Sequence, residues 1–274
     1  MGDVMHDEDE VRALVRERYG AIARGAGGCC PPATCGCGAE MAADGLNVIG
    51  GAYAGIAGRL ADADLNLGCG VPTQHAALAP GETVLDLGSG AGNDVFIARH
   101  EVGAAGYVIG VDMTPDMITR ARANARKLGY DNVEFRLGEI EHLPVASGSV
   151  DAILSNCVLN LLPDKAPAFV EMFRVLRAGG RLSVSDIVAT GELPAGVRQA
   201  AGLYVGCIAG ALPETEYFAL IGAAGFSDVR IAKAQPIALP DEALAPHMRG
   251  EELAAFRASG VRLKSVTLLA SKPA

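Results

Sequence analysis

Short apolar segments alternate with helical segments between residues 83 and 188, and this alternation restricts the fold more than any other feature. Apolar segments of strand length occupy residues 83–88, 106–113, 132–138, 150–156 and 180–188. Segments with helical character occupy residues 93–102, 114–129 and 164–180. Strands joined by helices run parallel, with helices covering both faces of the sheet. The sequence therefore predicts an α/β fold with a doubly wound, mostly parallel sheet.

Two later segments complete the predicted sheet. Residues 226–234 and 263–273 have strand character, which gives seven strands, and we expect one of these two to be antiparallel at the edge. A mostly helical insertion at 190–224 precedes them, and we expect a C-terminal cap. Residues 7–24 have apolar side chains at helical spacing. We divide the chain into an N-terminal part, a core and a C-terminal part, at residues 1–79, 80–189 and 190–274.

The charge of the chain argues against several kinds of partner. It has 23 basic and 32 acidic side chains and a formal net charge of −9. Without a basic excess, neither a phosphate backbone nor an anionic membrane surface is an expected partner. The first twelve residues lack the regions of a signal peptide, and no apolar run reaches the ~18 residues that span a bilayer. We therefore expect a cytoplasmic protein.

The segment VLDLGSGAGND, residues 84–94, is typical of a strand that turns through glycines into a helix. Gly88 and Gly90 let a ligand approach the backbone around Ser89. A dinucleotide site has the spacing G-x-G-x-x-G, whereas this loop reads G-x-G-x-G after an acid, Asp86. Because an acid suits an ammonium group better than a pyrophosphate, the loop favours S-adenosylmethionine as the cofactor.

Two other strand ends supply further candidate cofactor contacts. Asp112 ends the strand at 106–113 and is expected to accept hydrogen bonds from the ribose hydroxyls, with Met113 against the adenine. After the next strand, Glu139 is expected at the adenine amino group, and the backbone N–H of Ile140 at a ring nitrogen. Asn156, at the end of the fourth strand, is added to this cofactor site because ligands of such folds lie across the carboxyl ends of the strands.

Three isolated cysteines form a second candidate site: Cys69, Cys157 and Cys207. Cys157 ends the fourth strand, where the transferable methyl group is expected. Cysteines in a reducing cytosol are core residues, metal ligands or reactive groups. Thiolates are soft ligands, and three of them suit a soft trivalent centre such as arsenic. Arsenic bound by three sulfurs keeps a lone pair, so it can accept a methyl group without a general base.

The glycine loop, Asp112 and the segment GEIEHLP resemble the class I S-adenosylmethionine-dependent methyltransferases, which have a Rossmann-like fold. The segments LGCG, SNCVLNL and GCIAGAL resemble the three cysteine motifs of the arsenite methyltransferases. This resemblance implies transfer of a methyl group to trivalent arsenic, taken as a thiol conjugate, in arsenic detoxification. It implies that Cys69, Cys157 and Cys207 bind arsenic, with Cys69 needed for the unmethylated substrate. It also implies a thiol reductant, glutathione or thioredoxin, as a partner.

A fourth group of cysteines lies in the loop CCPPATCGC. The resemblance implies a disulfide relay through Cys29 or Cys30, while four thiolates including Cys35 and Cys37 could also hold zinc. Two other functions remain open at this point. One is a methyltransferase for a small organic acceptor, such as a quinone or sterol carbon. The other is a thiol-based arsenic binder without enzymatic activity.

Overall fold

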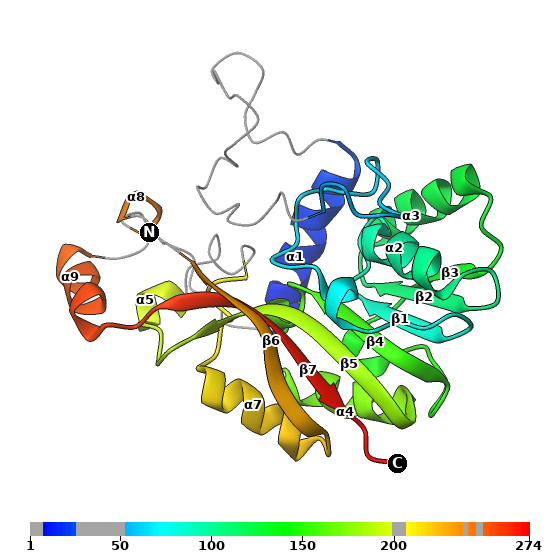
Figure 1. The fold of residues 1–274 in the computed structure, drawn as a ribbon. Coiled ribbons are helices and arrows are strands. Elements are labelled where there is room, and N and C mark those ends of the chain that lie inside the picture. Colours follow the sequence, from blue (N-terminus) through cyan, green and yellow to red (C-terminus); the bar gives the residue numbers. More distant parts are fainter. Residues whose placement is uncertain (1–7, 26–52, 199–206, 238–240, 245–248) are drawn as a thin grey trace.

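The computed structural model describes residues 8–25, 53–198, 207–237, 241–244 and 249–274, and Figure 1 shows its arrangement. Within these ranges seven strands form one sheet in the order β3-β2-β1-β4-β5-β7-β6. The strands are β1 (Thr83–Leu87), β2 (Tyr107–Asp112), β3 (Val133–Leu137), β4 (Val150–Asn156), β5 (Leu176–Ala189), β6 (Ser227–Ile237) and β7 (Leu263–Ser271). The α/β class, the doubly wound topology and the seven strands are confirmed.

The position of the antiparallel strand differs from the prediction. β7 pairs antiparallel with both β5 and β6, and it lies between them, so that β6 forms the edge. The side chains of β7 are mostly buried, whereas most of those of β6 are partly or fully exposed. The more apolar strand, β7, therefore lies inside the sheet, where its side chains are buried, and the more polar strand, β6, lies at the edge.

Helices cover both faces of the parallel part. On one face lie α2 (Asn93–Val102) and α3 (Pro115–Leu128), and on the other lie α4 (Ala166–Val175) and α7 (Glu214–Ala223). Strand β1 shows why its sequence is continuously apolar. Val84 packs in the cluster with α2 and α3, while Leu85 and Leu87 pack in the cluster with α4. Alternate side chains face opposite sides of the sheet, and both sides are buried.

The helix predicted at residues 164–180 is shorter than expected. Helix α4 ends at Val175, and β5 begins at the next residue. Leu176 pairs with Val150 of β4, and the register then shifts before Arg181 pairs with Ala152. Pairing with β4 therefore competes with continuation of the helix. The predicted end of the helix at residue 180 was wrong, because Gly179 and Gly180 lie in the irregular part of the strand.

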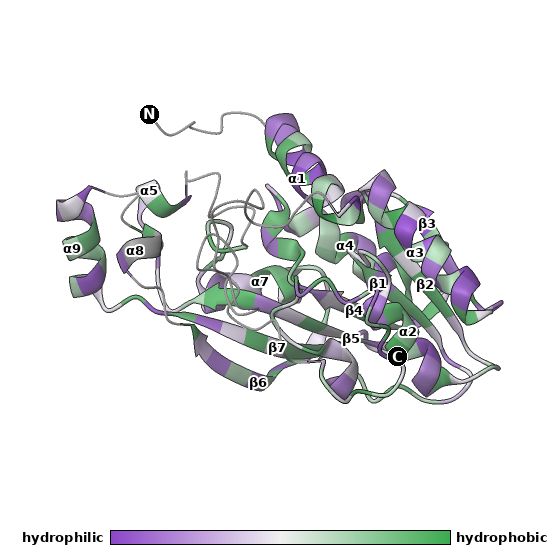
Figure 2. Cartoon of the chain, turned by 90° about the horizontal axis from the view of Figure 1, so that it is seen from above, coloured by the Kyte–Doolittle hydropathy of each residue, from purple (hydrophilic) through white to green (hydrophobic). Residues whose placement is uncertain are grey.

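Helix α1 (Glu8–Ala23) packs on α3 at the carboxyl end of the sheet. Val11 and Val15 are buried, and hydrophilic and hydrophobic segments alternate along the helix in Figure 2. Just after the helix, Arg24 pairs with Asp116 of α3. The helix predicted at residues 7–24 is thereby confirmed, and its apolar face closes one side of the site described below.

The remaining helices are shorter or more peripheral. They are the α-helices α5 (Ala195–Arg198), α8 (Asp241–Leu244) and α9 (Gly250–Ser259), and the 3-10 helices η1 (Pro72–His75), η2 (Ile140–His142) and η3 (Leu159–Leu161). Helices α8 and α9 lie at the end of the sheet away from α2 and α3 (Figures 1 and 2). None of the helices in the described ranges is long and apolar enough to cross a membrane.

One hydrophobic cluster joins all three predicted parts of the chain. It contains Val11 and Cys69 from the first part, Cys157 and Ile187 from the second, and Cys207 from the third. The division at residues 79 and 189 therefore stays a prediction about sequence organisation. The cluster also brings the three isolated cysteines into one region of the fold.

Candidate active site

A cavity opens at the carboxyl ends of β1, β2 and β4, where the sequence predicts a cofactor. Residues from these three strand ends line it, together with residues from α1 and from the segment before β1. Eight of the nine predicted cofactor residues are among them: Asp86, Gly88, Ser89, Gly90, Asp112, Met113, Ile140 and Asn156. The carboxyl ends of parallel strands meet at one edge, which explains how separate sequence segments form one site.

The glycine loop between β1 and α2 is crowded at Gly88 and needs a left-handed backbone at Gly88 and Gly90. A Cβ atom at Gly88 would lie 2.6 Å from a methyl group of Val158, and the residue has φ 65°. Gly90 also has a positive φ, 52°. The loop is fixed by a hydrogen bond from the Ser89 N–H to the Val111 carbonyl, 3.0 Å long. Its backbone therefore borders the cavity directly, as expected for a ligand-binding loop.

Asp112 is held with both carboxylate oxygens oriented. Oδ2 accepts a hydrogen bond from the Gly90 N–H at 2.9 Å, and Oδ1 accepts one from the Thr114 N–H at 2.8 Å. Burial raises the pKa of this carboxyl, while the two backbone hydrogen bonds lower it. Each oxygen keeps a further lone pair, so the carboxylate can accept hydrogen bonds from a diol.

Two other carboxyl groups, those of Asp86 and Asp94, line the same cavity. Asp86 is 2% exposed, and burial together with the charges of Asp94 and Asp112 raises its pKa well above the usual value. Burial raises the pKa of Asp94 to about 6, although hydrogen bonds from Tyr53 and Asn156 lower it. Buried carboxylates close to one another are unfavourable unless a cation accompanies them. The site therefore favours a ligand with positive charge.

Three polar atoms at this cavity have no hydrogen-bond partner within the described chain. They are Ser89 Oγ, Asn93 Oδ1 and Asp94 Oδ1, all buried and all on lining residues. Buried polar atoms are normally paired, and an unpaired group costs roughly 1–3 kcal/mol. Together with the acids, these atoms fit the ammonium, carboxylate and ribose groups of S-adenosylmethionine. Asn93 and Asp94 would face its amino-acid end, and Asp112 its ribose.

Glu139 does not line this cavity. Its carboxylate lies 2.5 Å from Arg16 of α1. The next acid, Glu141, does line the cavity and pairs with Arg12 at 3.2 Å. Glu139 thus pairs with α1 in this structure, and its contact with an adenine amino group stays a prediction. The segment GEIEHLP contains two acids, Glu139 and Glu141, and the sequence alone does not show which of them faces the cavity.

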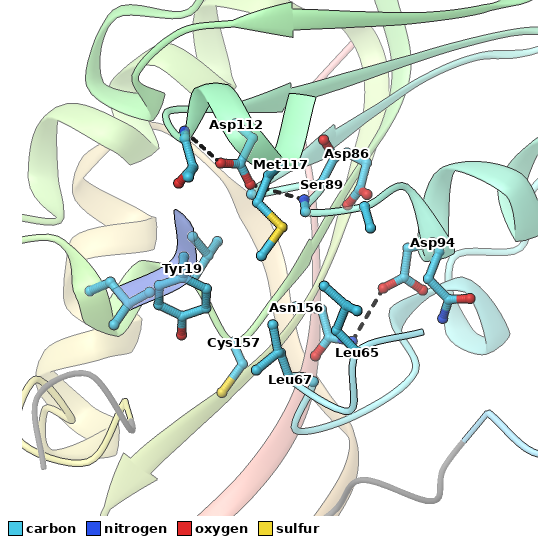
Figure 3. A pocket seen from close by; sticks show the side chains of 18 of the residues that line it. Tyr19, Leu65, Leu67, Asp86, Ser89, Asp94, Asp112, Met117, Asn156 and Cys157 are labelled. Carbon is cyan, nitrogen blue, oxygen red and sulfur yellow. Dashed lines mark hydrogen bonds between the residues drawn. The ribbon is translucent and has the colours of Figure 1, made fainter. Parts of the chain in front are cut away.

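Helix α1 closes the cavity from above. Val15 and Tyr19 are lining residues, and Figure 3 shows Tyr19 entering between Asp112 and Cys157. Burial raises the pKa of Tyr19 well above its usual value, and the nearby Cys207, Cys157 and Asp112 raise it further. A neutral phenol thus separates the ribose end of the cavity from the thiols. The amphipathic pattern of α1 predicted a packed helix but not this position.

The three isolated cysteines converge beside the cavity. The sulfur atoms of Cys69 and Cys157 and a carboxylate oxygen of Asp186 all lie within 4.8 Å of one another. The Cys207 thiol donates a hydrogen bond to the Cys157 carbonyl at 2.9 Å. Of the three, Cys157 also lines the cofactor cavity. Cys69 and Cys207 thus both lie beside Cys157, which borders the cavity, but the Cys207 sulfur is not among the ligand atoms that lie within 4.8 Å of one another. Binding of one soft centre by all three thiols stays a prediction.

Two of these cysteines have a backbone conformation that residues with side chains rarely adopt. Cys157 has φ 57° and Cys207 has φ 62°. Such left-handed residues cost of order 1–3 kcal/mol and collect at functional sites. The backbone of Cys157 is held by a 2.7 Å hydrogen bond from its N–H to the Ser185 carbonyl. The packing around both cysteines must therefore maintain this conformation.

The thiols are protonated in the free protein at neutral pH. Burial raises the pKa of Cys69. The pKa of Cys207 is raised well above its usual value by its hydrogen bond with Cys157 and by burial. That of Cys157 is lowered by the interaction with Cys207 but is raised more by Cys69 and by burial, so it also lies well above the usual value. Such thiols are weak nucleophiles until a soft centre displaces their protons.

Asp186 of β5 is the charged residue of this cluster and is 0% exposed. It accepts a 3.0 Å hydrogen bond from the Tyr217 hydroxyl and a 2.9 Å bond from the Ile187 N–H. Burial raises its pKa to about 6, while these hydrogen bonds and the charge of Lys165 lower it. Lys165 is itself buried and donates to the Gly210 carbonyl at 2.9 Å, which supports the Cys207 loop.

Sequence reasoning missed Tyr53, Asp94, Tyr19 and Asp186. Asp94 lies inside the glycine motif, but the motif was read for its glycines and first acid. Asp186 is an acid in an otherwise apolar strand, and a buried acid is a usable sign of a site. Tyr53 has no local signal, because it reaches the cavity through tertiary packing. Cys29, Cys30, Cys35 and Cys37 lie outside the described residues, so the relay and zinc alternatives stay predictions.

The fold and the cavity at its strand ends define a class I methyltransferase of Rossmann-like architecture. The family model of the methyltransferase domain matches residues 78–237, and the chain therefore belongs to the family of proteins with this domain. It is 48% identical over 233 residues, 82% of its length, to an arsenite methyltransferase of Halobacterium salinarum, of which it covers 60%.

Two further relatives are similar to the chain. It is 38% identical over 170 residues to a human arsenite methyltransferase, and it covers 45% of that protein. Among solved structures, the arsenic (III) S-adenosylmethionine methyltransferase of Chlamydomonas reinhardtii superposes with a TM-score of 0.62 at 37% identity. That match covers 74% of this chain and 66% of the algal one. The chain thus spans about half to two thirds of the relatives that it matches.

Proposed function

We propose that this protein transfers the methyl group of S-adenosylmethionine to trivalent arsenic. The observation that supports this most is the convergence of three thiols beside a cavity for a cationic ligand. The relatives named as arsenite methyltransferases support the same activity. Neither a quinone nor a sterol acceptor gives a reason for a buried thiol cluster at this place.

Substrate binding is proposed as an exchange of sulfur ligands. Arsenite arrives as a thiol conjugate, and each thiol of Cys69, Cys157 and Cys207 replaces one leaving thiol. Each protein S–H proton passes to the sulfur that leaves, so the exchange needs no net proton uptake. This suits thiols whose pKa values are raised, because the deprotonated state exists only during exchange. A small thiol such as glutathione, or thioredoxin, would serve as the source of reducing equivalents.

Methyl transfer is proposed to depend on positioning. The methyl group would pass from the sulfonium sulfur to the lone pair of the sulfur-bound arsenic, and S-adenosylhomocysteine would leave. Arsenic would thereby become formally pentavalent, and two electrons from the thiol reductant would return it to the trivalent state. Asp86, Asp94 and Asp112 hold the cofactor, and Cys157 places the arsenic at the border of the cavity. Tyr19 and Val15 exclude water from above. Orientation of two bound reactants can contribute ~7–11 kcal/mol to lowering the barrier, and no proton has to be removed from the nucleophile.

The test is an incubation of the full chain with methyl-labelled S-adenosylmethionine, arsenite and glutathione, followed by separation of the arsenic species. Labelled methylarsenicals are expected, and they should be lost in the variant Cys157→Ser. A parallel incubation replaces arsenite with a quinone or a sterol, and transfer of the label to that acceptor but not to arsenic would identify a methyltransferase for an organic acceptor. Arsenite binding without loss of the cofactor's methyl group would identify a thiol-based binder, and either result would refute the proposal.

A further inference from the structure

The side-chain amide of Asn156 fixes the loop that carries Cys69. Its Oδ1 accepts a hydrogen bond from the Cys69 N–H at 3.1 Å. Its Nδ2 donates to the Gly70 carbonyl at 2.9 Å. One side chain at the end of β4 thus binds the backbone on both sides of the Cys69 thiol, 87 residues away in sequence.

The residues that flank Cys69 are packed closely against their neighbours. A Cβ atom at Gly68 would lie 2.6 Å from Asn156 Nδ2, and one at Gly70 would lie 2.5 Å from Ser185 Oγ. The Cys69 carbonyl accepts a hydrogen bond from Ser265 Oγ at 2.5 Å. Both flanking glycines are therefore pressed against their neighbours, and the loop depends on Asn156 and β7 for its place.

The same amide also contacts the cofactor cavity. Nδ2 of Asn156 lies 2.5 Å from the Tyr53 hydroxyl and 3.2 Å from Asp94 Oδ2, and Tyr53 in turn donates to Asp94 at 2.5 Å. Figure 3 shows Asn156 between Asp94 and Cys157. Asn156 therefore links the acids that face the cofactor to the loop of one particular thiol, and no comparable link reaches Cys207 among the hydrogen bonds described.

The valence of arsenic gives this link a distinct chemical consequence. Unmethylated arsenite has three exchangeable ligands, whereas methylarsenite keeps one carbon and has only two. The Cys157 thiol interacts with the thiols of both Cys207 and Cys69, and Cys69 is the one whose backbone Asn156 binds. We propose that Asn156 is a positioning residue that holds Cys69 in place as the third ligand, and thereby determines the protein's capacity to methylate arsenite relative to methylarsenite. This inference rests on the proposed function.

The experiment compares arsenite and methylarsenite as substrates of the wild type and of Asn156→Ala. The ratio of kcat/KM for arsenite to kcat/KM for methylarsenite is expected to fall at least about tenfold, because small misplacements of a reacting group have large effects. Asn132→Ala is the matched control. It removes a buried amide that donates to the Gly103 and Gly106 carbonyls at 3.0 and 2.7 Å, remote from the thiols, and should leave the ratio within about twofold.

A double-mutant cycle with Cys69→Ser separates positioning from a general loss of structure. If Asn156 acts through Cys69, adding Asn156→Ala to Cys69→Ser should lower kcat/KM for arsenite by less than about twofold further. Should Asn156→Ala not fold, Asn156→Ser is measured in the same way. Three results would each overturn the inference. They are an equal loss of kcat/KM with both substrates, the same change of the kcat/KM ratio in Asn132→Ala, and additive losses of kcat/KM in the double-mutant cycle. If the wild type methylates neither substrate, it is the proposed function that fails.

Discussion

Asp94 gives the clearest link between charge, stability and ligand binding. Its carboxyl group is buried, and its pKa is raised from 3.8 to about 6, first by burial. An acid whose pKa is higher in the folded state than in the unfolded state binds its proton more tightly when folded. The free energy of unfolding therefore falls as the pH rises from about 4 to about 6, and the loss is complete above that range.

The size of this effect follows from the shift. One pKa unit corresponds to about 1.4 kcal/mol, so the raised value corresponds to a cost of about 3 kcal/mol at pH 7.5 in the ligand-free protein. Asp94→Asn cannot ionise, yet its amide oxygen can still accept the hydrogen bond from Tyr53. We expect the ligand-free variant to be more stable than the wild type at pH 7.5, by about 1–3 kcal/mol. Near pH 4 the difference should vanish.

The affinity for S-adenosylmethionine should rise with pH, whereas the free energy of unfolding falls. A cationic group favours the ionised form of Asp94, so the affinity of the wild type for S-adenosylmethionine should weaken by up to about tenfold for each pH unit below about 6. Asp94→Asn should bind more weakly at pH 7.5 and should lose this contribution to the pH dependence. The substitution thus trades affinity for stability, which is typical of acids held in a binding site.

Two measurements check this reasoning. Urea unfolding of the ligand-free proteins at pH 4.5 and 7.5 can be followed by far-ultraviolet circular dichroism, because the chain contains no tryptophan. Calorimetric titration with S-adenosylmethionine between pH 5 and 8 gives the affinity. Asp131→Asn, at an exposed position, is the control and should change neither quantity. If Asp94→Asn destabilises the ligand-free protein equally at both pH values, the ionised carboxyl is not costly and the argument is wrong.

Three further substitutions test other parts of the site. Cys157→Ser replaces a soft ligand with a hard one, and arsenite affinity measured by equilibrium dialysis should fall at least about 100-fold, whereas a decrease below threefold would contradict a role in binding. Gly70→Ala places a Cβ atom 2.5 Å from Ser185 Oγ. The free energy of unfolding measured in urea titrations should therefore fall by about 1–3 kcal/mol. An unchanged value would show that the Cys69 loop can move aside. Tyr217→Phe removes the hydroxyl that donates to Asp186. The free energy of unfolding should fall by about 1–2 kcal/mol at pH 7.5, where the Asp186 carboxyl is ionised, and by less at pH 5. Equal losses at both pH values would show that the hydrogen bond to the ionised carboxyl is not the cause.

The sheet was predictable because its strands are covered on both faces. Such strands read as continuous apolar runs, and β1 with Leu85 and Leu87 is an example. The end of α4 was not predictable in this way. Its last turn and the first residues of β5 have similar composition, and the pairing of Leu176 with Val150 decides between them. That pairing is a tertiary interaction, which overrides local propensity.

The cofactor side of the site was predictable to the extent that it lies at strand ends. Asp86 and Asp112 occupy such positions and line the cavity. Tyr53 could not be assigned, because its role depends on neighbours that are far apart in sequence, whereas Asp186 carried a signal as an acid in an apolar strand. Asn156 illustrates the limit: its place at the end of β4 predicted a cofactor contact, but its hydrogen bonds to the Cys69 loop come from the folded chain.

The support of the Cys69 loop by Ser265 has a consequence for synthesis of the protein. The two residues are 196 positions apart. At a translation rate of ~5–20 residues per second, the ribosome adds Ser265 about 10–40 s after Cys69. During that interval the Cys69 thiol exists without the strand β7 that later holds its backbone. A nascent chain made in the presence of arsenite would therefore meet this proposed substrate before the pocket for it is assembled.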